Sequence, residues 1–243
     1  MEDNLIHSRF KAAQWFNPGL EIIIGGLGGI GSHLNYILSR QGYTTYLYDF
    51  DTIEIHNVGS QMYSTADLTK NKAEKAAEIA ATYGNTEYHV LGKFTEDSPV
   101  SNIVFSCFDN MDARKLLFEK WSEHQLSKTP EYRKENPTEI NIFIDGRMVA
   151  ESMQVYSVKT IKEIEVYKKT LFDSAEIEPA PCSYKATYQT GTMIGSIMSM
   201  VFLNHVANKL TGVPARDTPF ATFFDNPMMY FKTYTANDYD KEF

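Results

Sequence analysis

The amino-acid sequence predicts an α/β fold, in which a doubly wound, mostly parallel β-sheet continues into a C-terminal antiparallel extension. Over the first two-thirds of the chain, short apolar runs alternate with amphipathic ones, the pattern of strands that pair in parallel through helical crossovers. After about residue 150 the pattern changes to a long helix and a hairpin. The composition marks no linker, so we expect residues 1–243 to form a single domain.

The expected elements follow in order along the chain. Strands are expected at Glu21–Ile24, Thr44–Tyr48, Glu87–Leu91, Asn102–Ser106, Asn141–Asp145 and Ser152–Val158. Helices are expected over about Ile30–Gln41, Asn71–Tyr83, Asp112–Gln125 and Thr190–Leu210. The second helix is rich in Ala, Glu and Lys, which favour helices, and Asp112 is a candidate N-cap for the third.

The last third of the chain is expected to be less regular. The long helix has apolar residues near one face: Ile194, Ile197, Met198, Val201 and Leu210. A hairpin is expected over Phe220–Thr235, with its turn at Asp225-Asn226-Pro227. The segment Lys159–Pro181 is charged and we expect it to be irregular, and we expect the acidic C-terminus to fray.

The composition excludes several classes of protein. Lys and Arg number 23 against 31 Asp and Glu, a net charge of −8, so nucleic acid is not expected as a main partner. No secretory signal is visible, and the longest apolar tract, Met193–Leu203, is far shorter than the roughly 20 residues of a membrane span. Cys107 and Cys182 are the only cysteines, so we expect neither a disulfide framework nor a structural zinc. We therefore expect a cytoplasmic protein with reduced thiols and no membrane association.

A glycine-rich loop stands between the first expected strand and the first expected helix. Gly26, Gly28 and Gly31 form a GxGxxG sequence, in which glycine permits positive φ and a close approach of phosphate to the backbone. The following helix would offer free N–H groups to that anion. Asp49 ends the second strand, where an acid accepts hydrogen bonds from ribose hydroxyls. We expect residues 1–150 to form a Rossmann-like nucleotide-binding half, although these glycines could also serve only helix–sheet packing.

The loops that follow favour ATP over a nicotinamide dinucleotide. Acids and amides gather in these loops together with a lysine: Asp51, Asn57, Gln61, Lys72, Asp109 and Asn110. Side chains at the carboxyl ends of parallel strands lie at the ligand crevice. Hydride transfer gives no reason for an extra acid, an amide pair and a lysine there. A reaction at a triphosphate does, because it uses carboxylate ligands for Mg²⁺ and a cation beside the leaving pyrophosphate.

Four motifs in this order resemble the ThiF/MoeB/HesA adenylyltransferases, which are related to the ubiquitin-activating enzymes. The motifs are GGLGGIG at 25–31, YDFDTIEIHNVGSQ at 48–61, NKAEKA at 71–76 and CFDNMDAR at 107–114. Weaker similarities are Cys182-Ser183-Tyr184 ahead of the long helix and FFDNPMMYFKTY at 223–234. The resemblance covers the chain from about residue 21 to 234, so the crossover loop, long helix and hairpin of residues 151–243 would complete the same domain.

This resemblance implies ATP- and Mg²⁺-dependent adenylation of a C-terminal carboxylate, that of a small ubiquitin-like or sulfur-carrier protein or of a peptide. It implies nucleotide contacts by Gly26, Gly28, Gly29, Gly31, Asp49, Asp51, Asn57, Gln61, Lys72 and Asn110. Lys72 would also neutralise the phosphates, and Asp109 would hold the metal. Arg9 would contact the phosphates, supplied across a homodimer, and Cys182 would be a reactive thiol, which some family members use to form a thioester or a persulfide.

The sequence also departs from the family pattern. Ser60 stands where family members commonly carry an arginine, and the loss of a cation from a triphosphate site weakens turnover. A degenerate, non-catalytic adaptor that binds nucleotide or a protein terminus is therefore an alternative function. An NAD(P)-dependent oxidoreductase is a third, but it accounts only for the glycine loop and Asp49.

Several residues have plain structural interpretations beside the functional ones. Arg9 could be a surface cation, Arg114 could lie on a solvated helix face, and Cys182 could be a spectator thiol. Cys107, between two phenylalanines, is expected in the core. The run Lys159–Lys169 is expected to be a solvated face, with a docking surface for an acidic carrier protein as the alternative.

Overall fold

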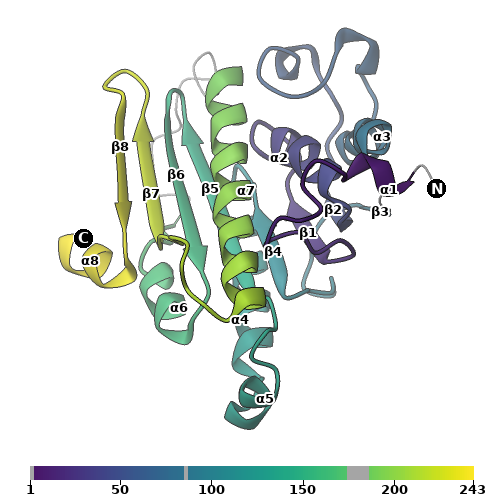
Figure 1. Ribbon diagram of the computed structural model, residues 1–243. Helices are drawn as coiled ribbons and strands as arrows, with labels where there is room; N and C mark the ends of the chain where they lie inside the picture. The colour runs from purple at the N-terminus through teal and green to yellow at the C-terminus, as the bar shows by residue number, and fades with distance from the viewer. Residues whose placement is uncertain (1–2, 85–86, 174–185) are drawn as a thin grey trace.

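The computed structural model describes residues 3–84, 87–173 and 186–243. Within them one sheet of eight strands has the order β3-β2-β1-β4-β5-β6-β7-β8 (Figure 1). Pairing is parallel from β3 through β5 and antiparallel from β5 through β8. The predicted doubly wound sheet with an antiparallel C-terminal extension is confirmed.

The elements agree closely with the expected ranges. The strands are β1 Glu21–Gly25, β2 Thr44–Tyr48, β3 Tyr88–Leu91, β4 Ile103–Ser106, β5 Ile142–Val149, β6 Ser152–Val158, β7 Ala221–Asp225 and β8 Tyr230–Tyr234. The helices are α1 Asp3–Ile6, α2 Gly31–Leu38, α3 Lys72–Tyr83, α4 Met111–Leu126, α5 Pro130–Glu135, α6 Ile161–Lys168, α7 Tyr188–Thr211 and α8 Ala236–Glu242. Short 3₁₀ helices lie at Ser39–Gln41, Ile55–Asn57 and Thr65–Asp67.

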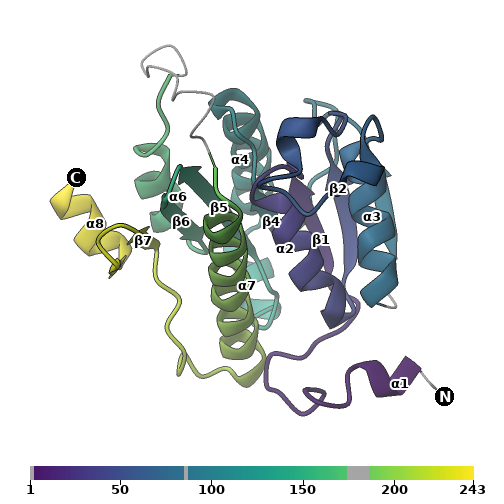
Figure 2. The same cartoon turned by 90° about the horizontal axis from the view of Figure 1, so that it is seen from above.

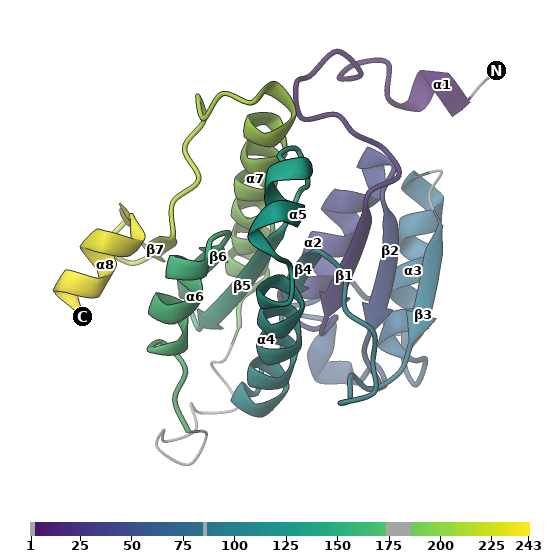
Figure 3. The same cartoon turned by 90° about the horizontal axis from the view of Figure 1, so that it is seen from below.

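Helices cover both faces of the sheet (Figures 2 and 3). On one face α2 and α3 pack over the parallel strands and α7 packs over β5 and β6, and Leu34 and Ile194 are fully buried with Ile24. On the other face lie α4, α6 and α8, with an aromatic cluster in which Phe118 and Tyr167 meet at 4.4 Å between ring centroids. The alternation of strand side chains between the two faces accounts for the two separate cores.

The register of the parallel strands defines the edge at which a ligand would bind. Gly25 is paired with both Tyr48 and Ser106, and Ser106 is paired with Asp145. These four residues form one row, and the loops after β1, β2 and β4 leave the sheet from it. We call this row and the loops beyond it the carboxyl edge.

Helix α7 approaches this edge closely because glycines face α2. A Cβ at Gly191 would lie 2.3 Å from the carbonyl oxygen of Gly29 and 2.9 Å from the ring of His33. A Cβ at Gly195 would lie 3.1 Å from the backbone nitrogen of Leu34. Helix α7 therefore packs directly against the glycine loop and the start of α2.

Four expectations about local structure are wrong. Helix α4 is capped by Asn110 rather than Asp112, because the Asn110 side-chain oxygen accepts the N–H of Ala113 at 2.8 Å. The segment expected to be irregular contains α6, whose start is fixed by a reciprocal capping box between Thr160 and Glu163. This T-x-x-E signal was present in the sequence.

The C-terminus and the end of α7 also differ from expectation. The tail forms α8, and Tyr239 anchors it to the sheet through ring contacts with Phe220 at 5.4 Å and Tyr156 at 5.8 Å between centroids. Leu210 is 41% exposed. It follows Val201 by nine positions, and at about 100° per residue that places it on the opposite side of the helix.

Three further expectations concern Cys107, Arg114 and the membrane. Cys107 is buried as expected, and burial raises the pKa of its thiol well above the ordinary value. Arg114 is buried, not part of a solvated helix face. Across residues 3–84, 87–173 and 186–243, no helix combines the length and apolarity needed to cross a bilayer.

The close approach of α7 to α2 yields a stability prediction. Gly191→Ala should lower the free energy of unfolding by about 1–3 kcal/mol, because the added methyl group must displace the backbone of the glycine loop. Gly92→Ala is the matched control, since a Cβ there would meet no heavy atom within 4 Å. Urea denaturation monitored by circular dichroism measures both; equal stability of the two variants would contradict the packing described.

Candidate active site

The glycine loop leaves β1 in a conformation that only glycine accommodates easily. Gly26 has φ of +86°, and its N–H donates to the carbonyl of Tyr48 at 2.8 Å. A Cβ at Gly31 would lie 1.8 Å from the carbonyl oxygen of Gly26. Gly28, in contrast, has open space, since a Cβ there would meet only Nε2 of Gln61, at 3.9 Å. The loop is tightly closed at both ends and open at its centre, as required for a phosphate that approaches the backbone.

Asp49 holds the glycine loop from the neighbouring strand. One carboxylate oxygen accepts the N–H of Leu27 at 2.7 Å, and the other accepts the N–H of Asp51 at 2.9 Å. Burial raises the pKa of Asp49, while the two backbone donors and the charge of Lys72 act in the opposite direction. The residue predicted to hold ribose therefore also fixes the shape of the loop, and its remaining lone pairs are available to a ligand.

Lys72 lies next to Asp49 at the start of α3. It is 7% exposed, and its Nζ lies 3.0 Å from Oδ2 of Asp51. The backbone N–H of Lys72 also donates to the carbonyl of Asp51 at 2.9 Å. The half-exposed carboxylate of Asp51 neutralises this buried cation, and bound phosphates are groups with which Lys72 could pair instead.

The amides of the second motif have different environments. Asn57 is buried, and its Oδ1 accepts the N–H of Glu54 at 2.8 Å, which closes the 3₁₀ helix. Gln61 reaches over the centre of the glycine loop, and its Oε1 is buried without a hydrogen-bond partner among the residues that the structure describes. A buried acceptor without a partner indicates a group that a bound ligand or water would satisfy.

His33 was not singled out by the sequence, and it connects three parts of the site. Its Nε2 lies 3.0 Å from the carbonyl oxygen of Ser60, and its Nδ1 lies 3.2 Å from the hydroxyl of Thr192. The ring meets Tyr188 edge-on at 4.6 Å. Burial lowers the pKa of His33, and because a carbonyl oxygen only accepts, Nε2 is the nitrogen that donates, to Ser60. The loop that contains Gln61 is thus tied to both α2 and α7.

Asp109 lies in the turn between β4 and α4, at the same edge. Its carboxylate is exposed and makes no hydrogen bond or ion pair with the described part of the chain. The next residue, Asn110, already uses its side-chain oxygen as the cap of α4. Of these two neighbouring candidates, Asp109 is the one whose oxygens remain available for a ligand.

A buried ionic network supports the turn that carries Asp109. Arg114 donates to the carbonyl of Phe108 at 2.6 Å and to the carboxylate of Asp145 at 2.7 Å. Asp145 is fully buried and also accepts from Arg147 at 2.7 Å and from the hydroxyl of Tyr167 at 2.9 Å. Although burial acts to raise it, the charges of the two arginines hold the pKa of Asp145 below its usual value. Asp145 and Arg147 were not predicted to support the site. The available signal was an acid and an arginine close together at the end of a strand that the sequence predicts to be buried.

The residues of the carboxyl edge suit the phosphates of a nucleotide better than a resident metal cluster. The open centre at Gly28, the buried cation of Lys72 and the unsatisfied Gln61 lie on loops that leave the row formed by Gly25, Tyr48 and Ser106. No group of three or more His, Cys, Asp or Glu side chains within the described ranges could hold a metal. Asp109 is suited to hold Mg²⁺ together with phosphate oxygens, since Mg²⁺ is usually bound by one or two carboxylates and the substrate's phosphates.

Two predicted site residues do not join this group within the described chain. Arg9 is exposed in the segment that leads to the amino end of β1. In the same segment His7 lies beside Gly42, just before the amino end of β2. The glycine loop follows the other end of β1. Cys182 lies outside the described residues.

The buried network yields a pH-dependent prediction. Asp145→Asn should lower the free energy of unfolding at pH 7 by about 3–5 kcal/mol, because two buried arginines lose their counter-charge. The folded-state pKa of Asp145 is depressed, so its stabilisation is present above the unfolded value of 3.8 and is lost as the pH falls through the folded value.

Urea denaturation from pH 7 to pH 2.5 measures this effect. The difference between wild type and Asp145→Asn should be constant above about pH 5 and should shrink below about pH 4. Asp217→Asn, at an exposed carboxylate, is the control and should show no such difference. A difference that stays constant down to pH 2.5 would contradict an ionised Asp145.

Comparisons with known proteins agree with this geometry. The family model described as ThiF family matches residues 19–242. A ubiquitin-like modifier-activating enzyme 5 of Dictyostelium discoideum is 30% identical over 119 residues, which make up 40% of this chain and 31% of that protein.

Solved structures share the fold at low identity. E. coli MccB in complex with ATP matches with a TM-score of 0.60 and 14% identity, over 92% of this chain and 65% of that one. E. coli MccB with AMPCPP and MccA has a TM-score of 0.63 and 15% identity, with 92% and 65% covered. PaaA has a TM-score of 0.60 and 13% identity, with 89% and 64% covered.

This chain thus spans less than two-thirds of the length of each of these proteins. The structural matches bear on the fold alone, whereas the family match covers the glycine loop, Lys72, Asp109 and the C-terminal hairpin together. The chain belongs to the ThiF family.

Proposed function

We propose that this protein adenylates the C-terminal carboxylate of a peptide or of a small ubiquitin-like or sulfur-carrier protein, using ATP and Mg²⁺. The observation that carries the proposal is the gathering of three features at the carboxyl edge. These are the open glycine loop, the buried cation of Lys72 and the free carboxylate of Asp109. A dinucleotide oxidoreductase would use only the first of them.

In the proposed reaction the C-terminal carboxylate attacks the α-phosphorus of ATP. A bond forms between the carboxylate oxygen and phosphorus, the bond to the β-phosphate oxygen breaks, and pyrophosphate leaves with that electron pair. The products are an acyl adenylate and pyrophosphate. The protein's task is chiefly electrostatic, because an anion must approach a polyanion.

Each residue of the edge has a part in this scheme. The N–H groups of the glycine loop and the start of α2 bind phosphate oxygens, and Asp49 accepts from the ribose. Lys72 would move its pairing from Asp51 to the phosphates and offset the charge that develops on the leaving group. Mg²⁺ bound at Asp109 would supply further neutralisation of the phosphates. Arg114 holds the Phe108 carbonyl and so fixes the turn on which Asp109 stands.

The choice of a carboxyl terminus as substrate rests on the relatives. MccB has been crystallised with MccA and a nucleotide analogue, and the Dictyostelium relative is a ubiquitin-like modifier-activating enzyme. We further propose that the protein acts as a cytoplasmic homodimer in which Arg9 reaches the partner's phosphates. Within one chain Arg9 lies in the segment before the amino end of β1, whereas the glycine loop follows the other end of that strand. In the proposed second step the thiolate of Cys182 attacks the acyl carbon, a thioester bond forms, the bond from that carbon to the phosphate oxygen breaks, and AMP leaves.

Ser60 favours a second function, that of a nucleotide-binding adaptor without turnover. Its backbone carbonyl is engaged by His33, and its short neutral side chain brings no charge to the phosphates. An arginine at such a site stabilises the charge of the transition state and contributes several orders of magnitude in rate elsewhere.

Isotope exchange between labelled pyrophosphate and ATP tests the proposal. With a cognate peptide or diglycine-ended carrier, the wild-type protein should catalyse exchange, and Lys72→Ala and Asp109→Asn should each lower it about 100- to 1,000-fold. Lys75→Ala, one turn further along α3, and Glu123→Gln on α4 remove the same charges away from the site and should keep exchange within a few-fold.

ATP affinity, measured in parallel by calorimetry, separates the two functions. ATP binding without exchange for any tested partner would refute the adenylation and support the adaptor. Loss of exchange in the Lys75 and Glu123 variants equal to that in the Lys72 and Asp109 variants would refute the assigned site.

A further inference from the structure

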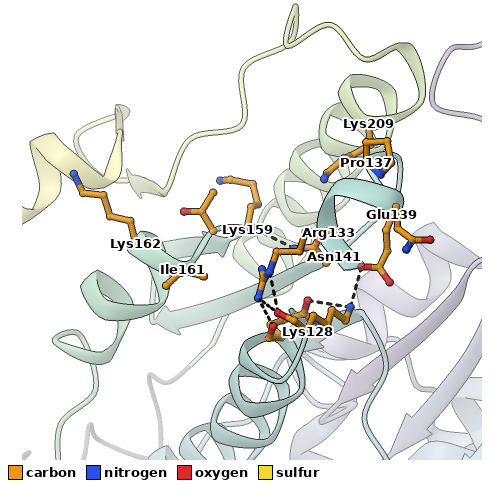
Figure 4. A pocket seen from close by; sticks show the side chains of 12 residues that line it. Lys128, Arg133, Pro137, Glu139, Asn141, Lys159, Ile161, Lys162 and Lys209 are labelled. Atoms are coloured by element: carbon orange, nitrogen blue, oxygen red, sulfur yellow. Dashed lines mark hydrogen bonds and ion pairs between the residues drawn. The ribbon is translucent and has the colours of Figure 1, made fainter. Parts of the chain in front are cut away.

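A basic cavity lies at the opposite edge of the sheet from the glycine loop. It has a volume of about 420 Å³ and is bordered by the C-terminal ends of α4 and α7, by α5 and by the link from β6 to α6 (Figure 4). The strand register explains its place. Ile142 opens β5 beside Ile103, the first residue of β4, and the antiparallel strand β6 ends there at Val158. The cavity therefore faces the amino ends of β4 and β5, the far end from the carboxyl edge.

The charge of the lining is strongly positive although the whole chain carries −8. Five cations line the cavity: Lys128, Arg133, Lys159, Lys162 and Lys209. Glu139 is the one carboxylate among the described residues of the lining. These cations come from three stretches of the chain, residues 128–133, residues 159–162 and the end of α7, so tertiary folding has concentrated them in one concave space.

Two of the five cations are neutralised within the protein. Nζ of Lys128 lies 3.0 Å from Oε2 of Glu139. Nζ of Lys159 lies 3.2 Å from Oε1 of Glu163 and donates to the carbonyl of Thr218 at 3.0 Å. These two lysines form part of the wall and are not free to bind a ligand.

The other three cations have no carboxylate partner in the described part of the chain. Arg133 donates to the carbonyl oxygen of Gln125 at 2.6 Å and also to that of Lys128, and Lys162 donates to the amide oxygen of Asn237. Lys209 makes no hydrogen bond or ion pair within the described residues, although its side chain is partly buried. A buried cation without a counter-charge is costly unless a ligand pairs with it.

In addition to burial, the positive charges of the lining lower the pKa values of Lys209 and of its neighbour His205. Burial lowers the pKa of Lys209, and Lys128 adds to this lowering against the attraction of Glu139. Burial, with the charges of Lys159 and Lys209, lowers the pKa of the neighbouring His205 to about 3. The neutral His205 adds no charge to the cavity at neutral pH.

From this geometry we propose that the cavity binds a small phosphorylated molecule, whose negative charge pairs with Arg133 and Lys209, whereas the Lys162 side chain is directed to Asn237 on α8 (Figure 4). The volume falls in the range of roughly 300–1,000 Å³ that small-molecule sites occupy. A phosphate group has enough oxygens to accept from a guanidinium and from an ammonium group at once. Because the cavity and the glycine loop are at opposite edges of the sheet, this site does not depend on the adenylation proposed above.

Calorimetric titration of the full chain with inorganic pyrophosphate tests this proposal. Lys209→Gln should weaken binding at the cavity about 10- to 100-fold, the loss of one charge-assisted hydrogen bond. Since Lys209 has no partner to lose, the variant should fold as the wild type does, and its circular dichroism checks this. Lys162→Gln, at an exposed position whose side chain is directed to Asn237 on α8, removes the same charge and should change affinity less than about 2-fold.

Two further variants separate this site from the carboxyl edge and from general electrostatics. Lys72→Ala removes the cation of the glycine-loop site and should leave pyrophosphate binding at the cavity unchanged. Lys134→Gln removes the same charge as Lys209→Gln one residue from Arg133, but outside the lining, and should change affinity less than about 2-fold.

The proposal is overturned if Lys209→Gln binds pyrophosphate like the wild type. It is also overturned if Lys134→Gln loses as much affinity as Lys209→Gln, or if Lys72→Ala alone abolishes all binding. A failure of pyrophosphate–ATP exchange leaves each of these readouts intact, so the two proposals can fail separately.

Discussion

The carboxylate of Asp49 joins the segments on which the carboxyl edge depends. It accepts one N–H from the glycine loop and one from the loop after β2, and the carbonyl of Asp51 in turn receives the N–H of Lys72. A single buried acid thus relates the open centre of the glycine loop to the buried cation at the start of α3. Such an acid must be satisfied by donors to remain charged in a site with little water. Because backbone donors hold both of its oxygens, the Asp49 carboxylate is fixed in position, in addition to its proposed role as a ligand for ribose.

The edge is supported from both sides by interactions that do not touch a ligand. Arg114, Asp145 and Arg147 brace the turn of Asp109, while α7 presses against the glycine loop through Gly191 and holds the Ser60 loop through His33. This arrangement suits a reaction that depends on position and charge, since small displacements of such groups cost much in rate. The basic cavity at the far edge shows that an acidic chain can still concentrate cations where strand ends and helix ends meet.

Much of the fold could be predicted because its signals are local. The strands before the glycine loop and Asp49, the Ala- and Lys-rich helix α3 and the hairpin turn near Asp225 each depend on neighbouring residues. Helix α6 could also have been found from its T-x-x-E cap, and α5 from Thr129 before Pro130. The burial of Arg114 could not have been predicted, because its counter-charge, Asp145, is 31 positions away along the chain.

The sequence by itself determined the class of sheet, the nucleotide-type loop and the residues Asp49, Lys72 and Asp109, because order and spacing along the chain carry that information. Only the tertiary structure decided which of those side chains are free. It showed that Asn57 and Asn110 are used as caps, that Gln61 has an unsatisfied oxygen and that Arg9 is exposed in the segment before the amino end of β1. It also brought Arg133, Lys162 and Lys209 into one cavity. Burial and pairing are properties of residues distant in sequence, and they are settled only when the sheet and its helices pack together.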